Sequence, residues 1–200
     1  MTKLWLMHCA CLEHPALFFK GMELVSDERR KKVNHAKKEL SKRQMLGAGI
    51  LLSYALANRG LKEQDMGYRV APSGKPYFEM VPELFFSLSH SGEWALCALG
   101  DAPVGADVQQ ITEYLPRVAK RCFSPEDAAC LEAMLPGRER DTAFTRLWAE
   151  RESQVKLLGD WSAGAKLPPV RNYDVSEEIC IAACGWDEKW SDDVIRVSFS

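Results

Sequence analysis

The stretch LWAERESQVKLLG, residues 147–159, spaces three side chains four positions apart: Trp148, Glu152 and Lys156. On an α-helix this spacing puts all three on one face. One interpretation is an ordinary exposed Glu–Lys pair, which stabilises a helix by roughly 0.2–0.5 kcal/mol. The other is one wall of an active site, with Glu152 as carboxylate and Lys156 as cation. The helix pattern alone favours the ordinary pair.

A second set of ligating groups lies in PVGADVQQI, residues 103–111. As a strand, this stretch points its alternate apolar residues to the core and turns Asp107 and Gln109 to the opposite face. An exposed polar face is the ordinary interpretation. Joined by a third carboxylate from elsewhere, the two oxygens would instead hold Mg²⁺, a hard cation that often bridges to phosphates.

Groups that donate to phosphate precede both stretches. FSLSHSG puts Ser87, Ser89 and Ser91 on one side of a strand with His90 between the last two, and Lys75 lies in the turn SGKP. The pattern has no G-x-S-x-G elbow, which excludes a serine hydrolase of that type. A single histidine or a turn lysine carries no function by itself.

Residues 29–43 hold eight Lys or Arg and one acid, Glu39. A solvated charged face is the usual interpretation. The alternative is a surface for a polyanion, either nucleic acid or a multiply phosphorylated cofactor. The aromatic residues expected among the cations of a single-strand binder are missing here.

The elements that must position these residues follow from periodicity, caps and turns. We expect a first strand over 3–11, strands over 84–100 and 103–111, and final strands after a looser tail, 160–175. One long helix is expected over 26–60, with Ser26 as its cap and Gly60 at its end. A helix over 124–134 has Ser124 at its cap and Pro125 at its first position, and a third helix covers 140–159. Residues 73–82 form a turn-rich connection.

A weak internal echo links EWALCALG, residues 93–100, and EICIAACG, residues 178–185. Two merely similar strands would explain it. So would two related α+β halves around a pseudo-twofold axis, with a ligand at their interface.

The length and composition of the chain limit the possible folds and locations. The chain has 200 residues, 46% of them apolar, which suffices for one domain or two small halves with a shared core. Seven cysteines without a C-x-x-C pair predict free thiols and no structural zinc. The longest uncharged run near the N-terminus, 44–58, is shorter than the ~20 residues of a membrane span. We therefore expect a soluble, cytoplasmic protein.

Taken together, the ordered motifs resemble the Sfp-type 4′-phosphopantetheinyl transferases. They are SDERRKKV and KRQMLG, then GKPYF, then FSLSHSGEWALCALG, then VGADVQQ, then LWAERESQVKLLG. The pair G-x-D-x-[E/Q] and W-x-x-x-E-S-x-x-K is the most specific. The motifs run from about residue 26 to 160, whereas the first strand and the tail match only in general character.

The resemblance implies an α+β fold of two pseudo-symmetric halves, each a small antiparallel sheet packed with a long helix, within a single compact unit. Residues 1–102 would form the half on the phosphate and adenine side of coenzyme A, and residues 103–200 the half with the metal and the catalytic helix. Coenzyme A would lie in the cleft between them. The enzyme would move 4′-phosphopantetheine from coenzyme A to a serine of an apo acyl or peptidyl carrier protein and release 3′,5′-ADP.

The resemblance also implies roles for individual residues. Asp107, Gln109 and Glu152 fall where the family holds Mg²⁺, which Mn²⁺ could replace. Glu152, Lys156 and Asp107 would be catalytic, and Arg151 falls where the family has a basic residue. The expected coenzyme A contacts are Arg29, Lys32, Arg43, Lys75, Ser89, His90 and Lys156.

One position departs from many relatives, which carry a glutamate where this chain has Gln109. The metal site then loses one negative charge, so we expect a higher Mg²⁺ requirement. Two other functions remain open: a nucleic-acid-binding module using residues 29–43, and a coenzyme A-binding protein without catalysis. The transferase interpretation implies no nucleic-acid or membrane partner, and a monomer, because the cleft lies within one chain.

Overall fold

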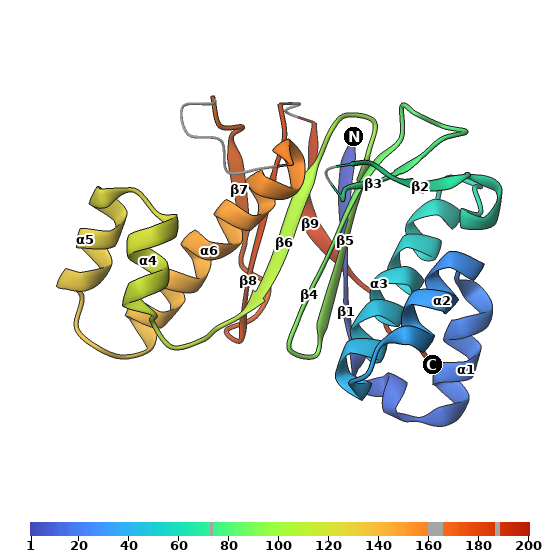
Figure 1. The fold of residues 1–200 in the computed structure, drawn as a ribbon, viewed down its shortest axis with the longest axis horizontal. Helices are drawn as coiled ribbons and strands as arrows, with labels where there is room; N and C mark the ends of the chain where they lie inside the picture. The colour runs from blue at the N-terminus through green and yellow to red at the C-terminus, as the bar shows by residue number, and fades with distance from the viewer. Residues whose placement is uncertain (73, 160–165, 187–188) are drawn as a thin grey trace.

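The computed structural model describes residues 1–72, 74–159, 166–186 and 189–200. Strands fill the middle of the molecule, and helices lie on its two outer sides (Figure 1). The expected α+β class with two halves is therefore confirmed. All seven cysteines are free thiols, as predicted. Among the described residues, no helix combines the length and apolarity that a membrane crossing requires.

The first half is built on a four-stranded sheet in the order β4-β5-β1-β9. These strands are β1 (Thr2–His8), β4 (Phe85–Ser91), β5 (Trp94–Gly100) and β9 (Trp190–Arg196). All neighbours are antiparallel except β1 and β9, which are parallel. The chain therefore returns at its end to the sheet in which it began, passing beyond the expected boundary at residue 102.

Helix α3 (Glu39–Ala57) packs on this sheet and supplies much of its core, including Leu46, Ile50 and Leu51. Smaller elements surround it. They are η1 (Cys9–Glu13), α1 (Pro15–Leu24), α2 (Asp27–His35), η2 (Glu63–Asp65) and the two-stranded sheet of β2 (Tyr68–Val70) and β3 (Pro76–Phe78).

The second half is a three-stranded antiparallel sheet in the order β6-β8-β7. Its strands are β6 (Gly105–Gln110), β7 (Val170–Tyr173) and β8 (Ile179–Cys184). The long helix α6 (Arg138–Leu158) packs on one face, and α4 (Pro116–Cys122) and α5 (Pro125–Ala133) lie beyond it (Figure 1). The central strands β5 and β8 are the two segments of the internal echo, which fits related halves.

The two sheets meet at β4 and β6 through serine hydroxyls. The Oγ of Ser87 accepts from the amide of Ala106 at 3.0 Å and donates to its carbonyl at 3.4 Å. The Oγ of Ser91 accepts from the amide of Gln110 at 3.1 Å. These side chains give β6 the hydrogen bonds that a neighbouring strand's backbone would otherwise provide. The alternate serines therefore fix the register between the halves.

The prediction of one helix over 26–60 is wrong. The chain leaves helical geometry at Ala36, where ψ is 133°, and α2 and α3 are separate helices. Val33 is fully buried, and α2 packs against α3 so closely that a Cβ on Gly49 would lie 2.9 Å from the Cγ of Arg29. A single straight helix would carry these side chains away from α3, so burial favours the break.

Other predicted boundaries fare better. The hydroxyl of Ser124 accepts from the amide of Asp127 at 3.0 Å, as expected of a cap, and α6 ends at the left-handed Gly159. The first strand, predicted to reach Cys11, ends at His8 because residues 9–13 turn into η1. Within the expected tail, residues 170–173 form β7, and residues 160–165 lie outside the described part of the chain.

Ser87→Ala should destabilise the protein by about 1–3 kcal/mol, because the buried amide and carbonyl of Ala106 lose their partner. The free energy of unfolding in urea measures this. Ser53→Ala, which removes a half-exposed hydroxyl of α3 that donates to the carbonyl of Leu24 at 3.0 Å, should cost less than about 0.5 kcal/mol, because water can replace it. Equal effects of the two substitutions would show that the junction contributes nothing special.

Candidate active site

Helix α6 lies directly on strand β6, and a glycine makes the contact possible. A Cβ on Gly105 would collide with the carbonyl oxygen of Ser153 and lie 2.9 Å from the amide nitrogen of Leu157. Without a side chain at 105, the helix backbone rests against the strand. The residues on that side of α6, Glu152 and Lys156 among them, therefore stand over the polar face of β6.

Asp107 is the buried centre of the site, with only 1% of its surface exposed. Its Oδ1 accepts from the Nζ of Lys156 at 2.6 Å and from the Oγ of Ser89 at 2.5 Å. Its Oδ2 accepts from the Nε2 of Gln109 at 2.8 Å. The interpretation of 103–111 as an exposed polar strand face is therefore wrong, because α6 covers that face.

Glu152 is half-buried beside this carboxylate. Burial raises the pKa of Glu152 above its ordinary value, and the negative charge of Asp107 raises it further, while Lys156 acts in the opposite direction. The two acids thus lie within each other's electrostatic field. Lys156 forms its ion pair with Asp107. The interpretation of Glu152 and Lys156 as an ordinary exposed ion pair on α6 is therefore wrong.

The oxygen donors suit a hard cation. Asp107 and Glu152 offer carboxylates and Gln109 an amide, the kind of donor set with which Mg²⁺ keeps several waters. Within the described ranges, no three His, Cys, Asp or Glu side chains cluster closely enough to hold a metal ion. Beside the two carboxylates, the amide of Gln109 is the predicted third ligand, and its Oε1 now accepts from Ser91 at 3.2 Å.

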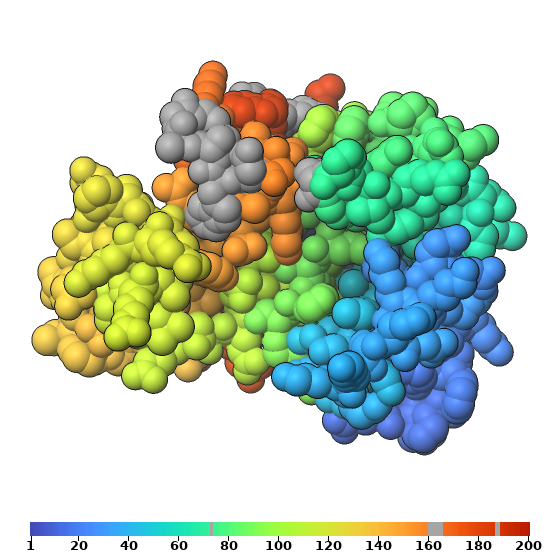
Figure 2. All heavy atoms as spheres, viewed as in Figure 1, coloured from blue at the N-terminus to red at the C-terminus, as the bar shows by residue number. Residues whose placement is uncertain are grey.

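A cavity of about 330 Å³ opens beside Lys156, between the β3 turn, β4 and the end of α6. Figure 2 shows the surface hollowed between α6 and the helices of the first half, with β4 and β6 at its floor. Lys75 lines this cavity, and its Nζ donates to the carbonyls of Val104 at 3.3 Å and Leu157 at 3.5 Å. Burial lowers the pKa of Lys75.

His90 lies on the opposite side of β4 from Ser89 and keeps part of its ring in solvent. The pKa of His90 is lowered, chiefly by the protein atoms packed around it and next by the positive charge of Lys156. Arg29 lowers it further, and Asp107 acts in the opposite sense. The imidazole thus lies within the field of cations from both halves.

The basic residues of the first half differ in how they are held. Arg29 is buried and lies 3.8 Å from the carboxylate of Glu63. Lys32 is exposed, and its Nζ donates to the hydroxyl of Tyr68 at 3.2 Å. Arg43 forms ion pairs with Glu93 at 2.7 Å and Glu13 at 3.2 Å.

Comparison with known proteins identifies this arrangement. The model of the 4′-phosphopantetheinyl transferase superfamily matches residues 103–178, which include Asp107, Gln109, Glu152 and Lys156. A 4′-phosphopantetheinyl transferase of Bacillus subtilis is 30% identical over 196 residues, covering 86% of this chain and 87% of the relative. The chain belongs to the 4′-phosphopantetheinyl transferase superfamily.

Further members of the superfamily are also similar. The 4′-phosphopantetheinyl transferase Sfp of Bacillus subtilis strain 168 is 26% identical over 201 residues, covering 89% of each chain. The 4′-phosphopantetheinyl transferase AcpT of Salmonella typhi is 36% identical over 117 residues, covering 57% of each. The protein is therefore a transferase of this type.

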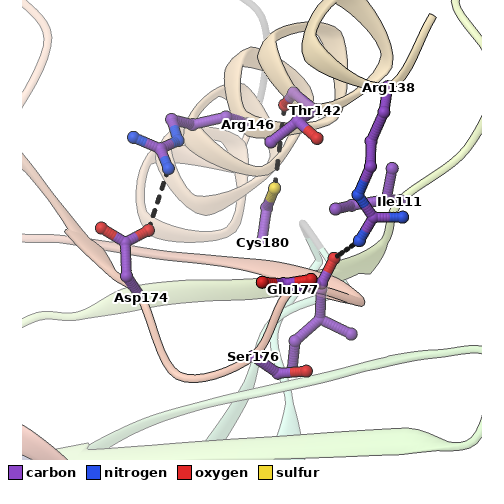
Figure 3. Close-up of a pocket in the computed structure, with 9 residues that line it drawn as sticks. Ile111, Arg138, Thr142, Arg146, Asp174, Ser176, Glu177 and Cys180 are labelled. Atoms are coloured by element: carbon purple, nitrogen blue, oxygen red, sulfur yellow. Dashed lines mark hydrogen bonds and ion pairs between the residues drawn. The ribbon is translucent and has the colours of Figure 1, made fainter.

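The transferase has a second cavity, of about 380 Å³, between the first turns of α6 and the loop from β7 to β8 (Figure 3). Arg146 pairs there with Asp174 at 2.9 Å, and Arg138 donates to the carbonyl of Glu177. Two arginines face two acidic residues, so the walls carry no excess positive charge. A polyphosphate fits the first cavity better than this one.

Several residues that contact the predicted site residues were not predicted from the sequence. Glu63 and Tyr68 contact Arg29 and Lys32 from a segment that carried no recognisable motif. No motif indicated that Glu93 and Glu13 would pair with Arg43. Ser87 and Ser91 were visible as alternate serines beside Ser89, but their role in joining two sheets depends on β6, which follows only after β5.

Lys156→Met should destabilise the metal-free transferase by about 2–3 kcal/mol at pH 7, because it leaves the buried carboxylate of Asp107 without its cation. Chemical unfolding in the presence of a chelator measures this. Adding Asp107→Asn to Lys156→Met should recover much of the loss.

Lys42→Met, which breaks a surface pair with Glu39, is the matched control and should cost less than about 0.5 kcal/mol. Additive effects of Lys156→Met and Asp107→Asn would contradict the pairing.

Proposed function

We propose that this protein transfers the 4′-phosphopantetheine group of coenzyme A to the serine hydroxyl of an apo acyl or peptidyl carrier protein and releases 3′,5′-ADP. The observation that carries the proposal is the convergence of Asp107, Glu152 and Lys156 beside the cavity between the two halves. Carboxylates and an ammonium at one point match the needs of phosphoryl transfer, which depends on positioning and charge neutralisation.

Asp107, Gln109 and Glu152 are the residues that would hold Mg²⁺, or Mn²⁺ in its place. The bound cation would offset negative charge on the pyrophosphate. The amide of Gln109 would have to present its oxygen, which now accepts from Ser91, in place of the N–H that now meets Asp107. Rotation of the amide group by half a turn accomplishes this exchange.

Side chains of the protein would stabilise the leaving group and remove the proton of the attacking serine. In the transfer, the serine oxygen bonds to the phosphorus that carries the pantetheine, and the bond from that phosphorus to the ADP oxygen breaks. Lys156 would stabilise the charge that develops on the departing ADP. Glu152 would take the serine proton, directly or through water.

Coenzyme A would lie along the cleft, with residues 1–102 binding its phosphate and adenine end and residues 103–200 its reacting end. Lys75 lines the cavity, and Ser89 and His90 lie on the adjoining strand. Arg43 would serve only after exchanging Glu93 or Glu13 for a phosphate. Because the cleft lies within one chain, we propose a monomer.

The basic segment 29–43 supports a nucleic-acid function poorly. Four of its eight cations already face acids: Arg29 with Glu63, Arg30 with Asp27, Lys42 with Glu39, and Arg43 with Glu93. Nonspecific binding to nucleic acid depends on many unpaired cations contacting phosphates. A substrate with a few phosphates at fixed positions suits the segment better.

Asp107→Ala and Glu152→Ala should each lower transfer by about 100-fold or more while the fold survives. The assay combines coenzyme A, Mg²⁺ and an apo carrier protein and looks for the mass of one phosphopantetheine on the carrier. Glu150→Ala is the matched control, because Glu150 points away on the same helix and accepts from Asn172 at 2.7 Å.

Other outcomes would refute the transferase function. Binding of coenzyme A without turnover by the wild type indicates an inactive cofactor binder. Salt-dependent RNA or DNA binding that Glu152→Ala leaves intact, with no transfer, indicates a nucleic-acid-binding module.

Gln109→Glu should lower the Mg²⁺ concentration needed for half-maximal transfer several-fold, because a third carboxylate adds a charge to the cation site. In a chelator the same variant should melt at a lower temperature, since two carboxylates would then face each other. Gln110→Glu, on the neighbouring exposed position, should change neither value. An unchanged Mg²⁺ titration for Gln109→Glu would count against Gln109 as a ligand.

A further inference from the structure

The second cavity, of about 380 Å³, lies apart from the Asp107 site. From α6 it is lined by residues four positions apart, Arg138, Thr142 and Arg146, which share one face of the helix. The loop from β7 to β8 closes its other side (Figure 3). None of its described lining residues also lines the cavity beside Lys156. A ligand in this cavity would therefore occupy a different place from coenzyme A.

The floor of the cavity is apolar. Ile179 and Cys180 are buried, and Ile111 packs against Cys180 and its neighbours. The Sγ of Cys180 donates to the carbonyl of Thr142 at 3.8 Å, and burial raises the pKa of this thiol. A neutral, buried thiol behaves as a small apolar group. The floor of the cavity therefore suits an aliphatic group of a ligand.

The rim of the cavity carries charged groups of both signs. Arg146 pairs with Asp174 at 2.9 Å, whereas Arg138 donates to the main-chain carbonyl of Glu177, which is neutral. Glu177 lies on the loop side of the cavity, opposite α6 (Figure 3). Across the described ranges of the chain, neither Arg138 nor the Glu177 carboxylate belongs to an ion pair. One cation and one anion at the rim therefore remain available to a ligand.

The charges around the cavity sum to zero, because two arginines face Asp174 and Glu177. The acids would repel a polyphosphate, and the arginines would repel a simple amine. A zwitterion carries both charges and no net charge, so its carboxylate can meet Arg138 while its ammonium faces Glu177. The volume of the cavity falls within the range of small-molecule sites. Charge, floor and volume together favour a small zwitterion with an aliphatic group.

We propose that this cavity is a binding site for a free α-amino acid with an aliphatic side chain. The carboxylate of the amino acid binds the Arg138 guanidinium, and its ammonium faces the carboxylate of Glu177. Its side chain packs on the apolar floor. The inference goes beyond the proposed function, because this site binds no part of coenzyme A and no part of the carrier protein.

NMR titration of the isotope-labelled protein with L-leucine tests the site. The amide signals of Ile111, Thr142 and Cys180 should shift, and those of Asp107 and Gln109 should not. Three analogues each lack one feature of leucine: 4-methylpentanoate lacks the ammonium, 3-methylbutylamine lacks the carboxylate, and glycine lacks the side chain. Each analogue should bind more weakly by roughly fivefold or more, since each loses one of the three contacts.

Two substitutions separate the charged contacts. Arg138→Met should weaken leucine binding by roughly fivefold and leave 3-methylbutylamine binding unchanged, because that probe has no carboxylate. Glu177→Gln should weaken leucine binding by a similar factor and leave 4-methylpentanoate binding unchanged, because that probe has no ammonium. The matched controls are Arg171→Met, which breaks an exposed pair with Asp192, and Glu178→Gln, next to Glu177 in the chain. Both controls should bind leucine as the wild type does.

The absence of shifts with leucine at millimolar concentrations overturns the proposal. Shifts confined to other parts of the chain also overturn it, as does a leucine affinity that survives both Arg138→Met and Glu177→Gln. The amide spectrum of each variant without ligand shows whether the variant folds. Arg138→Lys, which keeps the charge, should retain part of the affinity and separates loss of the cation from loss of the fold.

Neither coenzyme A nor a carrier protein enters this titration, so its result is independent of the transfer assay. A wild type that transfers phosphopantetheine but does not bind leucine refutes this inference alone. A wild type that binds leucine with the expected shifts but transfers nothing refutes the proposed function alone.

Discussion

A carboxylate removed from water must be compensated, and the burial of Asp107 is the constraint around which the rest of the structure is arranged. Its three donors come from three elements: Ser89 from β4, Gln109 from β6 itself, and Lys156 from α6. Ser89 belongs to the first sheet and Lys156 to the helix of the second. The compensation of Asp107 is therefore complete only when the two halves are joined.

The junction that brings these donors together uses side chains where a continuous sheet would use backbone. A serine hydroxyl donates and accepts, so Ser87 alone serves both the amide and the carbonyl of Ala106. Because alternate residues of a strand point the same way, Ser89 and Ser91 continue the row to Asp107 and Gln110. One row of hydroxyls thus joins the two sheets and contacts the candidate active site, and its first member, Ser87, also lines the cavity beside Lys156.

Local signals in the sequence sufficed for elements whose caps and turns are specified nearby. The hairpin of β4 and β5, the Ser124 cap and the Gly159 terminus of α6 all follow from residues within a few positions. Alternation along residues 103–111 also placed Asp107 and Gln109 on one face. The neighbouring residues could not show whether that face is exposed to solvent or buried, because the helix that covers it, α6, begins about 30 residues later.

The errors have the same origin. The break at Ala36 goes with the burial of Val33 and with the packing of Arg29 against Gly49, a contact between α2 and α3 that no capping residue in the sequence indicates. Arg43 reads as a free cation beside other cations, yet Glu93 and Glu13 reach it from distant segments. A motif gives the type of a residue and its place on an element, whereas the partners of a charged group are set by the tertiary fold.

The exchange of a carboxylate for Gln109 has a consequence for the charge of the cleft. Asp107, Glu152 and Lys156 together leave one negative charge, and a glutamate at 109 would leave two. A divalent cation in the proposed site would therefore give the centre one net positive charge here, and none with the glutamate. In the proposed site, the amide would weaken the attraction for the metal and would strengthen the attraction of the loaded site for a pyrophosphate. Asp107 has Lys156 as its partner, so its charge is compensated without a metal ion. Gln109 in the proposed site would therefore shift the balance of binding from the cation toward the anionic substrate.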